Sequence, residues 1–298
     1  MGIRKTPRFL AGVSAIAMLG AAGCGEQTVD TGGSQPEAVD EGQPDVLPET
    51  TGEVEQEGPQ AVDYRMAGEG EGEGGAPSGG EMGIDPVAAA NDPVIYLTAL
   101  EVMRAHYIAG LDALEAGERS AGAEMFSHPI SEIYVDLEPV IVERGVDSFM
   151  DALTQASVAP YQGASDEEIE ARVDAVLEAI DRAEAAAPQA EDMSAVRARV
   201  LADLVERAAL QYEFAAAEDA PEGAFLDGYG FAETAQRWAE RHLEAIAADH
   251  AGFADAARDA LGVLATAYPG PVSPDDLALP VADVLAANEP VQQTVSGL

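Results

Sequence analysis

From about residue 91 onward, apolar residues recur at intervals of three and four, and this spacing restricts the possible folds more than any other feature. Residues three and four apart share one face of an α-helix, whereas a half-buried strand alternates apolar and polar residues. The alternating pattern is absent from the sequence. The first helical face consists of Tyr96, Leu100, Met103, Tyr107, Leu111 and Leu114. The sequence therefore predicts an all-α fold, an antiparallel bundle of about seven helices.

Capping residues mark where the predicted helices begin. Asn91 or Asp92 can cap a helix whose first turn contains Pro93, because proline lacks the N–H that this position leaves unbonded. Ser165 and Glu168 have the spacing of a capping box at the start of another helix. We expect these helices to form one domain over residues 91–298.

In two stretches the sequence does not determine how the helices are arranged. Pro129 lies inside the apolar face of residues 126–140, so it either kinks one long helix or begins a new one. After Ser273 and Pro274 the sequence predicts only a short tail interrupted by proline.

The first 23 residues resemble a bacterial lipoprotein signal peptide. Three basic residues precede the apolar run 9–19, and small residues at 21–23 stand directly before Cys24, the only cysteine. The resemblance implies that Cys24 is acylated and becomes the first residue of a membrane-anchored mature protein. Gly25 follows in place of the aspartate that retains lipoproteins at the inner membrane, which implies the outer membrane, facing the periplasm. The alternative is an ordinary signal peptide with an unrelated cysteine.

Residues 24–90 contain too few large apolar side chains to form a core. From residue 25 onward this segment has 16 acidic residues and one basic residue, Arg65. Such a composition cannot offset the entropy lost on ordering. We expect a disordered acidic linker that holds the helical domain away from the membrane.

The charge of the chain excludes several classes of function. The chain has 15 basic and 55 acidic residues, and removal of a signal peptide with three of the basic ones leaves a net charge of −43. Nucleic acids and anionic lipid headgroups would be repelled, whereas cations would be attracted. With Cys24 acylated, no thiol is left for catalysis or for a disulfide.

His106, His128 and Glu132 form the strongest candidate site. His128 and Glu132 are four residues apart and would share a helical face. If the chain turns near residues 116–119, His106 and His128 are each about 11 residues from the turn and lie at similar heights. Two imidazoles and a carboxylate can bind a divalent transition metal. The alternative is a histidine hydrogen-bonded to a carboxylate where two helices pack.

The remaining histidines and motifs argue against an enzyme. His242 and His250 are eight residues apart beside Asp249, and they are interpreted as exposed polar residues. The sequence has no phosphate-binding loop, nucleophile elbow or zinc-protease motif.

A series of short motifs resembles the periplasmic helical domains linked to oxidase-dependent iron permeases and, more loosely, the imelysin-like iron-uptake lipoproteins. The similarity covers roughly residues 96–265 and rests on His106 to Leu111, His128-Pro129 with Glu132 and Tyr134, Gln211-Tyr212, and Asp227-Gly228-Tyr229-Gly230-Phe231. The resemblance implies that the bundle binds iron or passes it on. It also implies a partner protein in an envelope transport system. Gln211 and Ala224 stand where that pattern has glutamates, and the imelysin motif Gly-x-His-x-x-Glu is absent.

Two functions are therefore expected. In the first, a lipid-anchored helical module binds or transfers a cation, with iron as the candidate. In the second, the bundle is structural or docks a partner, and its histidines only pack.

Overall fold

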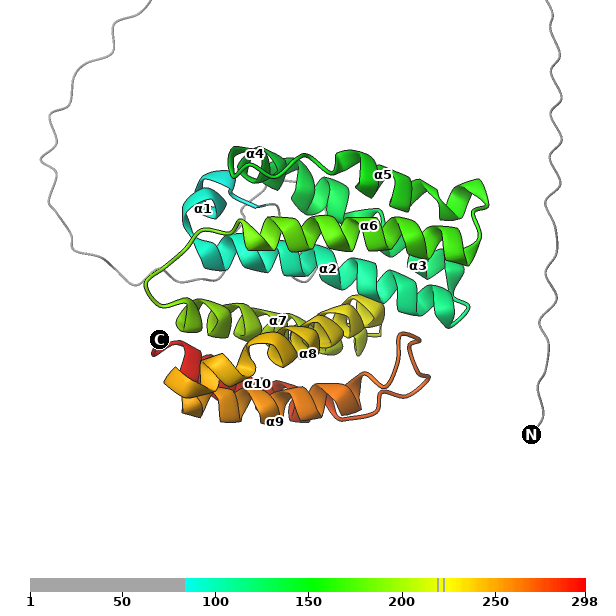
Figure 1. The fold of residues 1–298 in the computed structure, drawn as a ribbon. Coiled ribbons are helices and arrows are strands. Elements are labelled where there is room, and N and C mark those ends of the chain that lie inside the picture. Colours follow the sequence, from blue (N-terminus) through cyan, green and yellow to red (C-terminus); the bar gives the residue numbers. More distant parts are fainter. Residues whose placement is uncertain (1–83, 219, 222) are drawn as a thin grey trace, which may run out of the picture. The chain divides into compact units, whose positions relative to one another are not determined.

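The computed structural model describes residues 84–218, 220, 221 and 223–298, and within them every regular element is a helix (Figure 1). The prediction of an all-α fold is confirmed. None of the described helices combines the length and the apolar character needed to cross a membrane. The predicted signal peptide, Cys24 and the linker as far as residue 83 lie outside the described residues.

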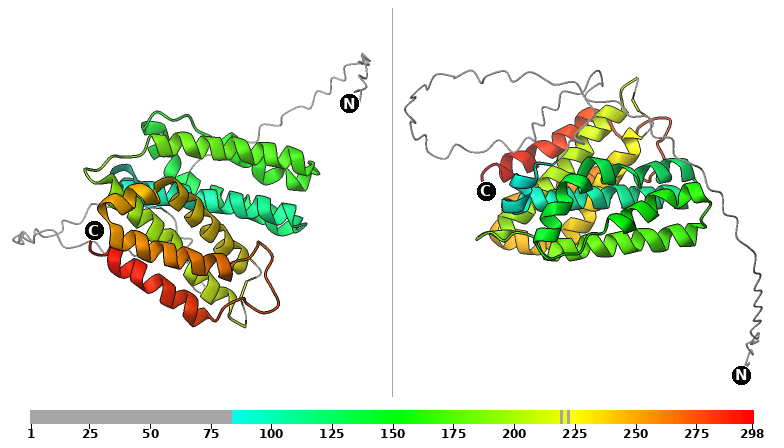
Figure 2. Two further views of the ribbon diagram at one scale, coloured as in Figure 1. Left: turned by 60° about the horizontal axis from the view of Figure 1, so that its bottom comes forward. Right: turned by 90° about the horizontal axis from the view of Figure 1, so that it is seen from above.

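Helix α2 is the central element of the bundle. It contacts α1, α3, α6, α7 and α8, while α9 and α10 pack beyond α7 and α8 (Figures 1 and 2). In chain order the helices are α1 (Pro86–Asn91), α2 (Pro93–Glu115), α3 (Arg119–Met125), the π-helix η1 (Ile130–Tyr134), α4 (Val135–Glu143), α5 (Met150–Val158), the 3-10 helix η2 (Pro160–Gln162), α6 (Asp166–Ala185), α7 (Met193–Ala215), α8 (Ala224–Asp249), α9 (Ala251–Ala267) and α10 (Val281–Val295).

Local sequence signals set the limits of the long helices. The Asp92 carboxylate accepts a hydrogen bond of 2.8 Å from the Val94 N–H at the start of α2. Ser165 and Glu168 form the predicted capping box of α6, each side chain accepting from the other residue's backbone N–H. These bonds satisfy N–H groups that a helix cannot satisfy internally.

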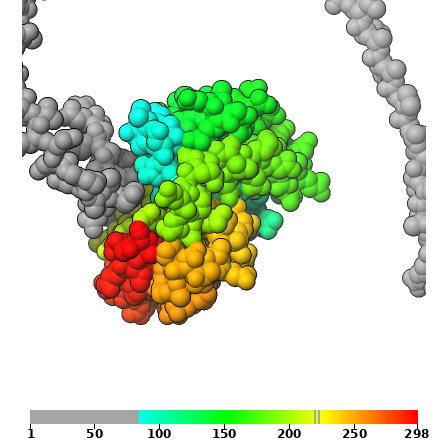
Figure 3. Space-filling model, turned by 60° about the vertical axis from the view of Figure 1, so that its left-hand side comes forward, coloured from blue at the N-terminus to red at the C-terminus, as the bar shows by residue number. Residues whose placement is uncertain are grey.

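Three parts of the fold differ from the prediction. The domain begins before residue 91, because α1 precedes α2 and both Ile84 and Ala89 are buried. The predicted face of residues 126–140 is not one kinked α-helix: α3 ends before it, and η1 and α4 follow Pro129, as in the alternative that Pro129 begins a new helix. The predicted tail contains a full helix, α10, which lies beside α9 (Figure 3) and buries Val284 and Val291. The bundle therefore has more helices than the seven expected.

Hydrogen bonds from buried tyrosines link the helices to one another. Three of these hydroxyls donate to a backbone carbonyl on a distant segment, so a polar group is buried without being left unbonded. The Tyr96 hydroxyl reaches Ala183 O at 3.1 Å, linking α2 to α6. The Tyr268 hydroxyl reaches Ala208 O at 2.7 Å. The Tyr212 hydroxyl holds the segment before α10 by donating to Leu279 O at 3.0 Å.

Candidate metal-binding site

The fold brings together two histidines and an aspartate from three separate segments. His106 lies in the middle of α2, His128 between α3 and η1, and Asp227 in the first turn of α8. One ligand atom from each residue lies within 4.8 Å of the other two. Ligand atoms bound to one ion at about 2.0–2.2 Å each are at most about 4.4 Å apart. A slight closing of the site would therefore allow all three to reach the same ion.

The hydrogen bond of His106 determines which of its ring nitrogens faces the site. Nδ1 lies 2.8 Å from Val102 O. A carbonyl only accepts, so Nδ1 carries the hydrogen and the neutral ring has its lone pair on Nε2. Nε2 lies 4.0 Å from Asp227 Oδ1. Metal-binding histidines commonly have this arrangement, in which one ring nitrogen donates to a carbonyl and the other faces the ion.

The ring of His128 lies directly beside that of His106. The two imidazole rings meet edge to face, with centroids 5.7 Å apart. His106 is 2% exposed, while His128 and Asp227 are half-buried. The Phe231 ring, centred 6.2 Å from that of His106, packs edge to face against the His106 imidazole.

Two close contacts between backbones hold the three segments in place. Gly122 of α3 lies so close to α2 that an added Cβ would be 2.5 Å from Gly110 O. An added Cβ at Gly230 of α8 would be 2.6 Å from Ala105 O. The first contact positions the segment that leads to His128. The second joins the neighbour of His106 to the helix that carries Asp227.

The π-helix η1 follows directly after His128 and Pro129. Its hydrogen bond runs from the Val135 N–H back five residues to Ile130 O. Short π-helical turns occur frequently at functional sites. Glu132 lies within η1 and is half-buried.

The structure changes the set of candidate ligands. His106 and His128 are brought together as the helical heights predict. Among the described residues, Asp227 supplies the third ligand atom of the close group, and the ligand role of Glu132 stays a prediction. Sequence reasoning assigned no ligand role to Asp227, although the residue belongs to the stretch Asp227 to Phe231 on which the family resemblance partly rests.

The other two histidines lie apart from this group. His242 Nε2 is 3.8 Å from Glu184 Oε1, and His250 Nε2 is 3.5 Å from Asp192 Oδ2. Both imidazoles are 17% exposed. The interpretation of both as exposed residues was therefore wrong, since each packs beside a carboxylate.

Comparisons with known proteins give no match: no family model fits the chain, and neither a curated protein nor a solved structure is significantly similar to it.

Proposed function

We propose that this protein binds a divalent transition-metal ion through His106, His128 and Asp227, and that it holds or passes on that ion as a lipid-anchored protein of the cell envelope. The observation that carries the proposal is the orientation of His106. Its Nδ1 hydrogen is directed to Val102 O, so the Nε2 lone pair is directed towards the Asp227 carboxylate 4.0 Å away. Two electron-pair donors that face each other suit a cation between them.

The chemistry of the donors favours transition metals over magnesium and calcium. Imidazole is a ligand for iron, zinc, copper and nickel, whereas magnesium and calcium prefer oxygen ligands. Two histidines and one carboxylate are the set that non-haem iron(II) sites use. Iron is also the metal that the family resemblance implies, and the lipoprotein signal implies the anchor at Cys24. The acidity of the chain adds a general attraction for cations.

A packing role for the same residues is the alternative. A protonated His106 paired with Asp227 would hold α2 against α8 without any metal. The bundle would then serve as a structural or partner-docking module. The two functions differ in whether a transition metal stabilises the fold more than another divalent cation does.

The test is the melting temperature with zinc or iron(II), minus that with an equal concentration of magnesium. Magnesium reproduces the screening of a highly acidic chain without favouring imidazole. A metal at about one hundred times its dissociation constant adds about 2.7 kcal/mol. This corresponds to roughly 5–10 °C for a domain of this size.

Two variants of aspartates on the same helix make the measurement specific. Asp227→Asn should abolish most of the difference between the transition metal and magnesium. Asp249→Asn, at the exposed end of α8, should preserve it. If the wild type and Asp227→Asn show the same difference, the residues only pack and the metal-binding proposal is rejected.

A further inference from the structure

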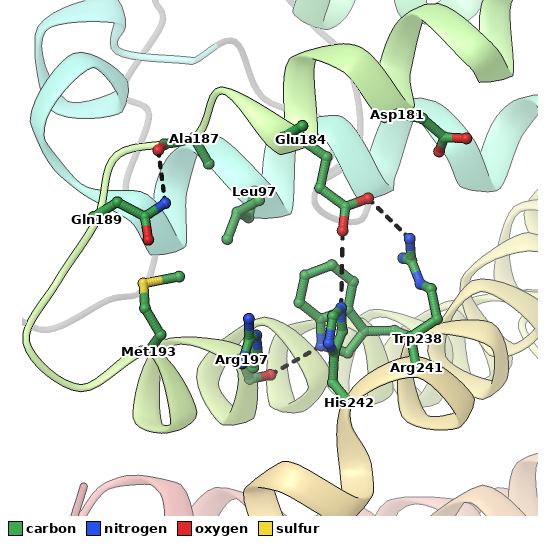
Figure 4. A pocket seen from close by; sticks show the side chains of 11 residues that line it. Leu97, Asp181, Glu184, Ala187, Gln189, Met193, Arg197, Trp238, Arg241 and His242 are labelled. Carbon is green, nitrogen blue, oxygen red and sulfur yellow. Dashed lines mark hydrogen bonds and ion pairs between the residues drawn. The ribbon is translucent and has the colours of Figure 1, made fainter.

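A pocket of about 450 Å³ lies beside the second half of α8 (Figure 4). Its walls come from α2, the end of α6 with the loop after it, the start of α7, and α8. Trp238 in its wall is 11 residues beyond Asp227 on the same helix, a separation of about 16 Å. The pocket is therefore distinct from the candidate metal site, and a ligand could occupy it whether or not a metal is bound.

One part of the pocket wall is apolar. Leu97, Met193 and Trp238 are its largest apolar side chains, and Ala185 and Ala187 lie beside them. Trp238 is fixed in place, since its indole N–H donates to Arg197 O at 3.0 Å and the Arg241 guanidinium lies 5.1 Å from its ring centre. A volume of this size and a mostly preformed wall are typical of small-molecule sites.

The acidic groups around the pocket are already paired with arginines. Glu184 accepts from Arg241 Nη1 at 2.9 Å (Figure 4). It also accepts from Arg104 Nη2 at 3.1 Å. Glu101, which is fully buried, accepts from the same two arginines. Asp181, 62% exposed, is 2.9 Å from Arg104 Nη1. The carboxylates in and behind the wall are thus largely neutralised.

Arg197 also lines the pocket, but its guanidinium has no such partner. Its backbone carbonyl accepts from Trp238, while its side chain makes no ion pair or hydrogen bond with any other residue that the structure describes. A half-buried guanidinium beside an apolar surface can offer two parallel N–H donors to a carboxylate.

We propose that this pocket binds a small amphipathic monocarboxylate, with its carboxylate on Arg197 and its apolar body against Leu97, Met193 and Trp238. A cation would find the carboxylates of the wall already occupied by arginines. A dianion such as phosphate carries more charge than the single unpaired guanidinium of Arg197 can balance, and it has no apolar body to cover the rest of the wall. A single planar carboxylate fits the guanidinium of Arg197, and an apolar body fits the apolar part of the wall.

Fluorescence can test this proposal directly, because Trp238 is the only tryptophan of the chain. The probe is sodium hexanoate, titrated at neutral pH into the mature protein. Hexanamide has nearly the same shape without the charge, and hexylammonium has the opposite charge. We expect hexanoate to bind about tenfold or more tightly than hexanamide, since a charged hydrogen bond is worth more than a neutral one.

Two arginine variants show whether the preference comes from this site. Arg197→Gln should remove the preference for hexanoate and leave the binding of hexanamide unchanged. Arg258→Gln, on α9 with a side chain that is 50% exposed, should leave both affinities as in the wild type. Far-UV circular dichroism verifies that both variants are folded. The proposal fails if hexanoate gives no response, if hexanamide or hexylammonium binds as tightly, or if Arg197→Gln retains the preference.

Discussion

Substitution of Gly230 by alanine should separate the helices that carry His106 and Asp227. The added Cβ would lie 2.6 Å from Ala105 O and 3.0 Å from Ala109 Cβ. The first of these atoms belongs to the backbone of α2, so no rotation of a side chain can relieve the overlap. The two helices must therefore move apart by about half an ångström to reach an acceptable contact.

The effect on stability is a balance of two terms. Overpacking of a close contact costs about 1–3 kcal/mol. Alanine in a helix interior gains about 0.5–1 kcal/mol over glycine. The net loss is about 1–2 kcal/mol, which lowers the melting temperature by about 2–8 °C in a domain of this size.

The effect on the metal site results from the same displacement. His106 Nε2 and Asp227 Oδ1 are 4.0 Å apart, and half an ångström more would require the site to close further, against the new Cβ, before one ion could reach all three ligands. The extra stabilisation by zinc or iron(II) over magnesium should therefore fall together with the melting temperature. Both quantities come from the same thermal unfolding series.

Gly262→Ala is the matched control, because an added Cβ at this position in α9 meets nothing within 4 Å. It should raise stability by about 0.5–1 kcal/mol through helix propensity and leave the response to metal unchanged. If Gly230→Ala stabilises the protein as Gly262→Ala does, the close contact between α2 and α8 does not constrain the fold, and the reasoning is refuted.

Two further predictions concern an ion-pair network and the membrane anchor. Burial alone would raise the pKa of Glu184, but His242, Arg241 and Arg104 outweigh it and lower the pKa to about 2. This carboxylate therefore stabilises the fold above its ordinary pKa of 4.5 and loses that effect as the pH falls towards 2. Glu184→Gln should cost about 2–3 kcal/mol in urea unfolding near neutral pH and distinctly less at about pH 3, and an equal cost at both pH values would contradict the assignment. Cys24→Ser should release the protein from the membrane pellet on fractionation, and a variant that stays in the pellet would rule out the lipid anchor.

Local signals made the long helices predictable. Asp92 with Pro93, and Ser165 with Glu168, act through hydrogen bonds to residues two or three positions away, so the sequence contains all the information needed to place them. Helix α10 lacks such signals. It contains Pro290 and buries only Val284 and Val291, and it depends on contacts with α7 and α9 that no local pattern reveals.

Only the part of the candidate site that depends on a single helical hairpin could be predicted from the sequence. The approach of His106 to His128 results from a single hairpin of two helices. Asp227 is 99 residues beyond His128, and only the packing of α8 on α2 brings it near. Glu132 was chosen from the four-residue spacing of an α-helix. That rule does not hold in η1, where the hydrogen bond spans five residues.

The π-helix also makes the geometry of the site sensitive to the deletion of a single residue within η1. A π-turn holds one residue more than the α-turn that would otherwise span the same distance. Loss of the exposed Ser131 would allow an uninterrupted α-helix and would turn the preceding residues by about 100° relative to α4. Leu137 and Ile141 fix α4 in the core. The segment that carries His128 would therefore rotate instead, and its imidazole would move away from His106. A single-residue deletion that removes no ligand could thus dismantle the site as completely as the loss of a histidine.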